Sequence, residues 1–403
     1  MIALVGGSLV LPGHVVPGGS LLLRNGRIAA IERGRADPAG ATIIETHGAY
    51  ILPGFVDVHV HGLGGHDTLD GGDAIARIAA LLPAHGVTAF CPTTTACAPA
   101  ELHAACAAVH RLRTERPAGA ARVLPAHLES NFINPAYRGA QPAACLRLPP
   151  HTGSPVEPDG AFSALDILDV VARWRAEVGI VTLAPELPGG LDLLRSLHAL
   201  GHRVALGHSG ATFEQALEAA DAGARHVTHL FNAMSPMHHR RPGLAGAALA
   251  HEGLCVELVC DAVHVHPAVC RMALTLKGAS GIMAVTDATS VTGLAPGSIG
   301  RLGGQALHAA ADAARLADGT LAGSTLTMER AFQQIVKGLG GSVTEASAMC
   351  SGTPARELGL SGLGALVDGA LADVVVMDRE FRIVRTFIDG LEVYVAPGHQ
   401  PGA

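Results

Sequence analysis

The middle of the chain repeats one pattern eight times: a short apolar segment, then a loop, and usually a helical stretch. Alternating strands and helices form a parallel sheet covered by helices, because each helix carries the chain back to the start of the next strand. Eight such units are the number that closes a (β/α)8 barrel. We therefore expect an α/β protein built on a TIM-type barrel. The expected strands span residues 54–59, 88–92, 123–128, 180–183, 204–208, 226–229, 255–259 and 282–286.

Both ends of the chain read as short strands instead of β/α units. The N-terminal strands are expected at 2–5, 20–24, 27–32 and 42–45, with a hairpin turn at Asn25-Gly26. The C-terminal strands are expected at 373–377, 382–388 and 392–395. Two small β segments can pair with each other, with the barrel inserted between them. We expect residues 1–52 and 346–403 to form one small β-sandwich domain and residues 53–345 to form the catalytic barrel.

Composition narrows the classes of partner. The 403 residues are 49% hydrophobic and 16% charged, which is typical of a folded chain. The net charge is −7 and no basic run occurs, so nucleic acid is not an expected partner, and an anionic substrate would need local positive groups.

Cysteine usage and hydropathy indicate a location in the cytoplasm. The eight cysteines are scattered without a C-x-x-C pair, as expected for reduced thiols. The N-terminus lacks the basic region of a signal peptide. The one long uncharged window, residues 78–100, contains three prolines, so no membrane span is expected.

Polar side chains follow five of the expected strands at the point where each strand ends. They are His59, Glu129, His208, His229 and Asp287, and His61 lies on the same strand face as His59. Glu186 and Asp261 also follow strands. Barrel active sites lie at the C-terminal ends of the strands, so these side chains are expected to meet.

Imidazole and carboxylate groups in this combination favour a divalent metal, Zn²⁺ first, with Fe, Mn or Co as alternatives. Such an ion activates water and polarises a carbonyl, and Asp287 is suited to carry the proton to a leaving nitrogen. The chain has only two lysines, Lys277 and Lys337. A carboxylated lysine bridge is therefore not expected, and Glu129 is the better bridge if two ions bind.

Longer motifs resemble the amidohydrolase superfamily and, within it, the N-acetylglucosamine-6-phosphate deacetylases. The resemblance spans about residues 20–395. The stretches that carry it are PGFVDVHVHG (53–62), HLESNFINPAYRGA (127–140), GHSGAT (207–212), HLFNAM (229–234), RPGLAG (241–246), DAVHVHP (261–267), VTDA (285–288) and DGTLAGSTLTM (318–328).

The resemblance implies a role for individual residues. Glu129, His208 and His229 would be the core metal ligands, His59 and His61 would hold a second ion, and Asp287 would be the catalytic acid/base. Asn232, Ala233, Arg240 and His264 would contact the sugar phosphate, the last two across the interface of a homodimer. Ala140, Gln141, Leu321, Ala322 and Gly323 would line the sugar. The implied substrate is N-acetylglucosamine 6-phosphate, hydrolysed to glucosamine 6-phosphate and acetate in amino-sugar catabolism.

Two departures from the family pattern leave alternatives open. Ser130-Asn131 stands where the family has Gly-Pro, and Gln141 stands where it has a histidine. A deacetylase of another N-acyl amino sugar is one alternative. A sugar-phosphate-binding homologue without catalysis is another, and the retained Asp287 argues against it.

Overall fold

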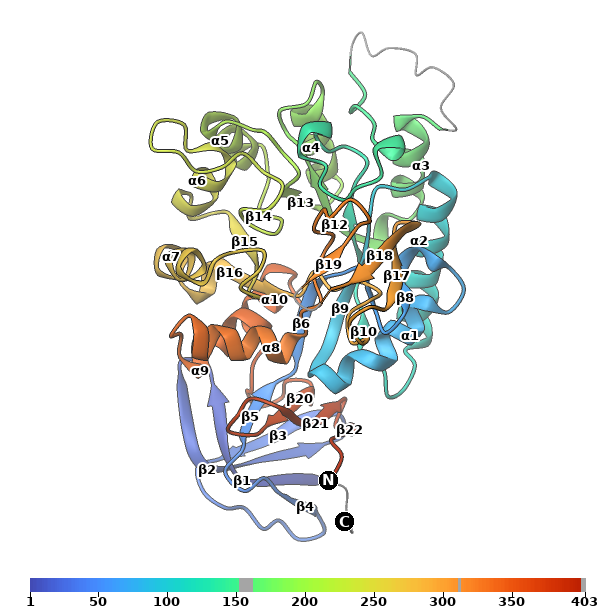
Figure 1. Cartoon of the computed structure of the whole chain (residues 1–403). Helices are drawn as coiled ribbons and strands as arrows, with labels where there is room; N and C mark the ends of the chain where they lie inside the picture. Colours follow the sequence, from blue (N-terminus) through green and yellow to red (C-terminus); the bar gives the residue numbers. More distant parts are fainter. Residues whose placement is uncertain (152–161, 311–312, 400–403) are drawn as a thin grey trace.

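The computed structural model describes residues 1–151, 162–310 and 313–399. The last four residues of the expected terminal domain, 400–403, lie outside this range. The chain folds into a barrel with a separate sheet below it, and strands from both ends of the chain form that sheet (Figure 1).

Eight parallel strands form the nearly closed barrel, and the expected α/β barrel is confirmed. Strand β16 returns to β6 through the Val60–Ala288 bridge and the hydrogen bond from Asp287 N to His59 O. The barrel strands are β6 (Phe55–Val60), β9 (Val87–Thr94), β11 (Ala126–Glu129), β12 (Val178–Leu183), β13 (Arg203–Leu206), β14 (His226–Val227), β15 (Cys255–Val259) and β16 (Ile282–Val285).

Most of the expected barrel strands differ by a residue or more in their bounds, and three of these differences have a structural reason or affect the site. The segment expected at 123–128 is divided into β10 (Arg122–Val123) and β11, because Pro125 between them has no N–H to donate to a neighbouring strand. Strands β13 and β14 end at Leu206 and Val227, earlier than expected, so His208 and His229 lie in the loops that follow.

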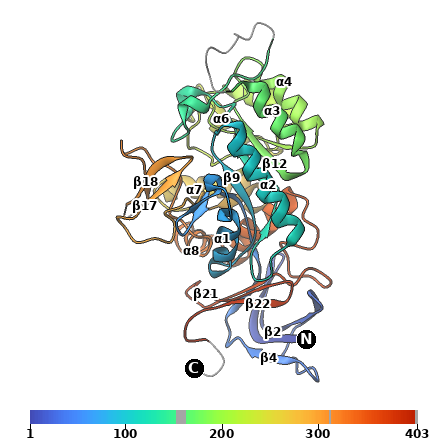
Figure 2. The same ribbon diagram turned by 90° about the vertical axis from the view of Figure 1, so that its right-hand side faces the viewer.

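Helices surround the barrel and bury their apolar faces against its strands (Figure 2). Gly86 lets the chain turn directly into β9 with a left-handed φ of 76°. The helices are α1 (Ala74–Leu81), α2 (Pro99–Glu115), α3 (Ala164–Arg173), α4 (Gly190–Ala199), α5 (Phe213–Asp221), α6 (Gly243–Ala250), α7 (Pro267–Lys277), α8 (Met328–Gln333), α9 (Val343–Ser347) and α10 (Thr353–Glu357). Met349, Cys350 and Ala355 pack in the barrel core, beyond residue 345.

The strands from the two chain ends are hydrogen-bonded into one sheet of eight strands, as the terminal strand patterns led us to expect. Strands β5 and β20 join the N-terminal and C-terminal parts. Leu4, Leu21, Val374 and Phe387 belong to its own core. Its strands are β1 (Ile2–Leu11), β2 (His14–Arg24), β3 (Arg27–Glu32), β4 (Thr42–Glu45), β5 (Tyr50–Pro53), β20 (Val374–Met377), β21 (Ile383–Ile388) and β22 (Leu391–Val395).

Two small β elements were not expected from the sequence. Strands β7 (Gly62–Leu63) and β8 (His66–Asp67) form a short hairpin after β6. Strands β17 (Ile299–Leu302), β18 (Gln305–Ala309) and β19 (Ala314–Arg315) form a three-stranded sheet that projects from the barrel (Figure 2). Across the described ranges, no helix has both the length and the apolar character needed to cross a membrane.

Candidate active site

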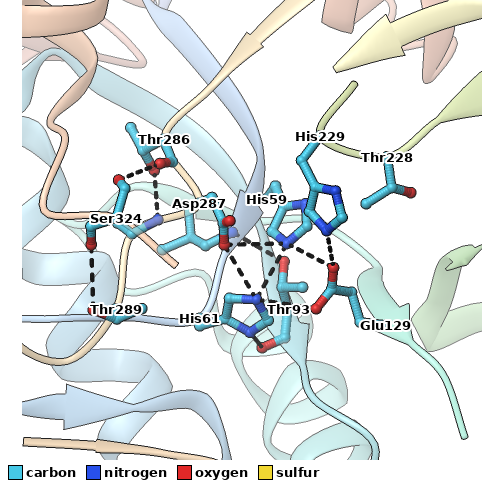
Figure 3. A network of polar contacts seen from close by, with 12 residues as sticks. His59, His61, Thr93, Glu129, Thr228, His229, Thr286, Asp287, Thr289 and Ser324 are labelled. Carbon is cyan, nitrogen blue, oxygen red and sulfur yellow. Dashed lines mark hydrogen bonds and ion pairs between the residues drawn. The ribbon is translucent and has the colours of Figure 1, made fainter. Parts of the chain in front are cut away.

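The six polar residues expected at the strand ends meet in the barrel. His59 lies in β6 and Glu129 ends β11, while His61, His208, His229 and Asp287 follow their strands by one or two residues. All six are buried. Parallel strands end at the same side of the barrel, so their terminal side chains converge there, as Figure 3 shows for five of the six.

Three of these residues have an unusual backbone conformation. The φ angles of His208, His229 and Asp287 are 48°, 28° and 52°, which side chains other than glycine rarely adopt. Left-handed residues that the surrounding fold holds in place are concentrated at functional sites.

Glu129, His208 and His229 form one group of possible metal ligands. The Oε1 atom of Glu129 lies 2.8 Å from His229 Nε2 and 3.2 Å from His208 Nε2. The two Nε2 atoms are 3.1 Å apart. Three donor atoms therefore point at one small volume.

His59, His61 and Asp287 form a second group beside the first. The Nε2 atoms of the two histidines are 3.2 Å apart, and Asp287 Oδ1 lies 3.5 Å from His59 Nε2 and 3.4 Å from His61 Nε2. Glu129 faces both groups, because its Oε2 atom is 3.4 Å from His61 Nε2. If two ions bound, its two oxygens would be able to contact both.

The hydrogen bonds on the far side of the rings identify the nitrogens that are free to bind metal. His61 Nδ1 and His208 Nδ1 donate to the backbone oxygens of Thr93 and Tyr137, which can only accept. His59 Nδ1 donates to Glu257 at 2.8 Å. In the neutral rings, Nε2 of each then presents a lone pair to the centre. Lone pairs and carboxylates that face one another at these distances fit a divalent cation between them.

The electrostatics of the centre also favour positive charge. Burial opposes protonation of His61 and His229, but the carboxylates of Asp287 and Glu129 outweigh it and raise their pKa values to about 10 and about 9. Burial alone would raise the pKa of Glu129, yet His208, His229 and His59 hold it well below its usual range.

Asp287 is the carboxylate at the mouth of this centre. Its backbone is fixed by hydrogen bonds from its N–H to His59 O and from Ser324 N to its own oxygen. Burial opposes its ionisation, but His59, His61 and His229 keep its pKa below the usual value. Asp287 is therefore ionised and free to accept a proton.

A cavity of about 410 Å³ opens above the centre. Nearly all of the expected substrate residues line it: Ala140, Gln141, Asn232, Ala233, His264, Leu321 and Gly323. Two expected residues do not. Arg240 is exposed on the loop before α6, and Ala322 is buried in a small apolar cluster with residues of β17–β19.

The residues that differ from the family pattern fall into two groups, one inside the barrel wall and one at the cavity. Ser130 donates to Thr182 O, and Asn131 donates to Cys97 O and Cys145 O, so both side chains are satisfied within the barrel wall. Neither lines the cavity. Gln141, by contrast, lines the cavity. Its side-chain amide nitrogen donates to Glu129, and its side-chain oxygen accepts a hydrogen bond from Ala96 N at 2.8 Å.

Sequence reasoning missed several residues of the site. Glu257 in β15 is fully buried and contacts His59. The signal was present, because an acidic residue in the middle of the apolar strand Cys255–Val259 is costly without a partner. Tyr137, Leu302 and Thr320 also line the cavity. Tyr137 and Thr320 lie in two of the quoted motifs, but no role was expected for any of the three.

Comparison with known proteins places the chain in a family. No model of a protein family matches it. N-acetylglucosamine-6-phosphate deacetylase of Lysinibacillus sphaericus is 34% identical over 381 residues, with 91% of each chain covered. N-acetylgalactosamine-6-phosphate deacetylase of Escherichia coli is 34% identical over 372 residues, covering 92% of this chain and 93% of that protein.

A solved structure is similar over almost the whole length. It is a mutant N-acetyl-D-glucosamine-6-phosphate deacetylase from Mycobacterium smegmatis in complex with N-acetyl-D-glucosamine-6-phosphate. It has a TM-score of 0.86 and 32% identity, and the match covers 97% of this chain and 99% of that one. The barrel and its buried histidines and carboxylates are those of a hydrolase of the amidohydrolase superfamily. Within that superfamily, the chain belongs to the N-acetylglucosamine-6-phosphate deacetylase family.

Proposed function

We propose that the protein hydrolyses the acetamide of N-acetylglucosamine 6-phosphate and releases acetate and glucosamine 6-phosphate. One observation carries the proposal: two adjacent groups of buried metal-ligand atoms, both faced by Glu129, lie at the floor of a cavity lined by the expected substrate residues. A barrel with only a structural role would have no use for such a costly cluster.

The donor set suits Zn²⁺ best, with Fe, Mn or Co as alternatives, and one or two ions per chain. A cation held by these residues polarises the scissile carbonyl and makes a water molecule more acidic. Glu129, His208 and His229 form the more compact set, and His59, His61 and Asp287 complete the second.

Asp287 carries out the proton transfers. Its carboxylate takes a proton from the attacking water and delivers it to the amide nitrogen as the C–N bond breaks. The neighbouring imidazoles keep Asp287 ionised until the water arrives. The amine thus departs neutral and the acetyl group leaves as acetic acid, which loses its proton to the solvent to become acetate.

Recognition of the phosphate is expected at the other end of the cavity. Within the described chain, the N–H of Ala233 has no acceptor, and it lies in a turn whose left-handed residues can expose amide groups to an anion. His264 is held by Asp261, with 2.6 Å between His264 Nδ1 and Asp261 Oδ2. Burial opposes its protonation, but Asp261 outweighs burial and raises its pKa. The protonated ring would donate to phosphate.

The expected role of Arg240 depends on the oligomeric state of the enzyme. Arg240 lies outside the cavity of its own chain, so we expect it to bind phosphate in the site of a second subunit within a homodimer.

The cysteines indicate where the enzyme is located. They are free, and seven of them are buried, which suits the reducing cytoplasm.

N-acetylgalactosamine 6-phosphate is a second candidate substrate. A relative named for that sugar is as similar as one named for the glucosamine sugar. Gln141, which contacts Glu129 at the cavity wall, stands where the family pattern has a histidine.

Acetate release measured with a panel of sugars tests the proposal. The panel holds N-acetylglucosamine 6-phosphate, N-acetylgalactosamine 6-phosphate and both sugars without phosphate. We expect the glucosamine phosphate to have the highest kcat/KM and the unphosphorylated sugars the lowest. A preference for the galactosamine phosphate would select the second candidate, and equal rates with and without phosphate would overturn both.

A further inference from the structure

Glu257 is a buried carboxylate that the proposed mechanism does not use. It lies in the middle of β15 with no exposed surface, and its side chain points into the barrel among residues of β6 and β14. Its Oε1 atom has no hydrogen-bond partner among the described residues. An ionised carboxylate is one of the most costly groups to bury, so a neutral glutamine would serve better if only packing mattered.

The contacts of Glu257 lead to the metal ligands. Its Oε2 atom accepts a hydrogen bond from His59 Nδ1 at 2.8 Å and lies 3.3 Å from the backbone N–H of His229. One carboxylate oxygen therefore holds the ring of a ligand in the second group and the left-handed backbone of a ligand in the first.

Glu257 does not itself belong to a third metal site, although His59, His127 and Glu257 lie close together. His127 Nδ1 donates to Val58 O, and its Nε2 is 2.7 Å from the Thr182 hydroxyl. Both ring nitrogens are thus occupied.

The four ligand imidazoles differ in what holds them. Backbone oxygens hold His61 and His208, and His229 Nδ1 has no partner in the described ranges. His59 alone among the four has a carboxylate on its far nitrogen. A carboxylate there fixes the tautomer, aligns the ring and makes the metal-binding nitrogen more basic.

From this geometry we infer that Glu257 is a positioning residue, which orients His59 and sets the affinity of the His59–His61–Asp287 group for its cation. The inference rests on the metal-dependent activity proposed above. It predicts unequal sites, in which the ion at this second group depends on Glu257 more strongly than the ion at Glu129, His208 and His229.

Retention of metal by the full chain tests the inference. Zinc-loaded protein is exposed to increasing concentrations of dipicolinate, and zinc per chain is measured after gel filtration. We expect Glu257→Gln, which keeps shape and removes charge, to lose one ion at about 10- to 100-fold lower chelator than the wild type. The remaining ion should be released near the wild-type concentration.

Glu357→Gln is the matched control. Glu357 is a carboxylate of α10 that lies 3.4 Å from the ring of His226, away from the metal ligands. Its release curve should match that of the wild type. The melting temperature of each variant, measured in parallel, detects misfolding.

A double variant separates a specific effect on the second ion from a general loss of metal. In a His59→Asn background the second ion is already lost, so adding Glu257→Gln should leave the release of the other ion unchanged. Identical curves for Glu257→Gln and wild type would overturn the inference, as would a further loss in the double variant. A wild-type protein that binds no zinc would instead overturn the proposed function.

Discussion

Asp287 is the single residue on which the proposed proton transfers depend. Asp287→Asn preserves the shape of the side chain but removes the base, so turnover should fall by roughly 10²–10⁴-fold. The ion held by Glu129, His208 and His229 should persist, because those three ligands are unchanged. Acetate release and zinc per chain, measured on one preparation, check this. Near-normal turnover would exclude Asp287 from the reaction.

His264 gives the phosphate interaction a pH dependence. Its pKa is raised by Asp261 against the effect of burial, so the ring is charged below that pKa and neutral above it. The charge-assisted contact should contribute about 1.5–3 kcal/mol, or roughly ten- to a hundredfold in kcat/KM. The ratio of wild type to His264→Asn for the phosphorylated sugar should be largest at low pH.

The ratio should shrink as pH rises through the raised pKa of His264. Comparing wild type and variant at each pH cancels the titration of the substrate phosphate itself. A ratio that does not change with pH would show that the charge of His264 plays no part in binding.

The candidate metal ligands could be predicted from the sequence, because their positions along the chain are enough to identify them. His59, Glu129, His208, His229 and Asp287 each follow an apolar strand, and parallel strands share one end, so their convergence needed no coordinates. The hydrogen-bond partners that hold these side chains in place could not be predicted. The pairing of Glu257 with His59 joins strands 198 residues apart, and no local pattern encodes it.

At the scale of elements, the alternation of strands and helices predicted the barrel. It did not predict where each strand ends or which small elements are added to the barrel. Pro125 ended one expected strand because it lacks an N–H. The sheet of β17–β19 was not predicted, because its strands are short and do not continue the β/α pattern. It nevertheless reaches the site, since Gln305 of β18 donates to Ala140 O at 2.7 Å.

Arg122 links the barrel to the terminal sheet. Its guanidinium in β10 forms an ion pair with Asp373, 2.9 Å away, and contacts Asp389 in the turn after β21. The Arg122 and Asp373 side chains are 12% and 2% exposed, so Arg122→Met leaves a buried carboxylate without its partner. We expect a loss of about 3 kcal/mol in the free energy of unfolding, measured with urea.

Arg116→Met is the control for this prediction. Arg116 contacts the same Asp389 at 3.5 Å, but its side chain is 60% exposed, so its loss should cost less than about 1 kcal/mol. Equal destabilisation by the two variants would show that the Arg122 ion pairs do not hold the two parts together.

At the scale of the whole molecule, Arg240 lies outside the cavity of its own chain, and the proposed homodimer would place it in the site of a second subunit. Arg240→Ala should reduce kcat/KM for the phosphorylated sugar by about ten- to a hundredfold, since a charge-assisted contact is lost. The unphosphorylated sugar should be barely affected. Equal loss with both sugars would contradict a role in phosphate binding.

Mixed dimers test whether Arg240 acts across the interface. Refolding Arg240→Ala chains together with Asp287→Asn chains should restore about a quarter of wild-type activity, because half of the dimers would contain one complete site. Wild-type chains mixed with Asp287→Asn chains set the scale. No recovery above the separate variants would mean that Arg240 serves its own subunit or none.

A zinc titration shows whether hydrolysis of N-acetylglucosamine 6-phosphate depends on metal bound in the barrel. Protein stripped with a chelator is reloaded with zinc in steps, and acetate release and bound zinc are measured on each sample. Activity should be absent without metal and rise in proportion to bound zinc, while His229→Ala should recover neither. Full acetate release from metal-free protein would contradict the account.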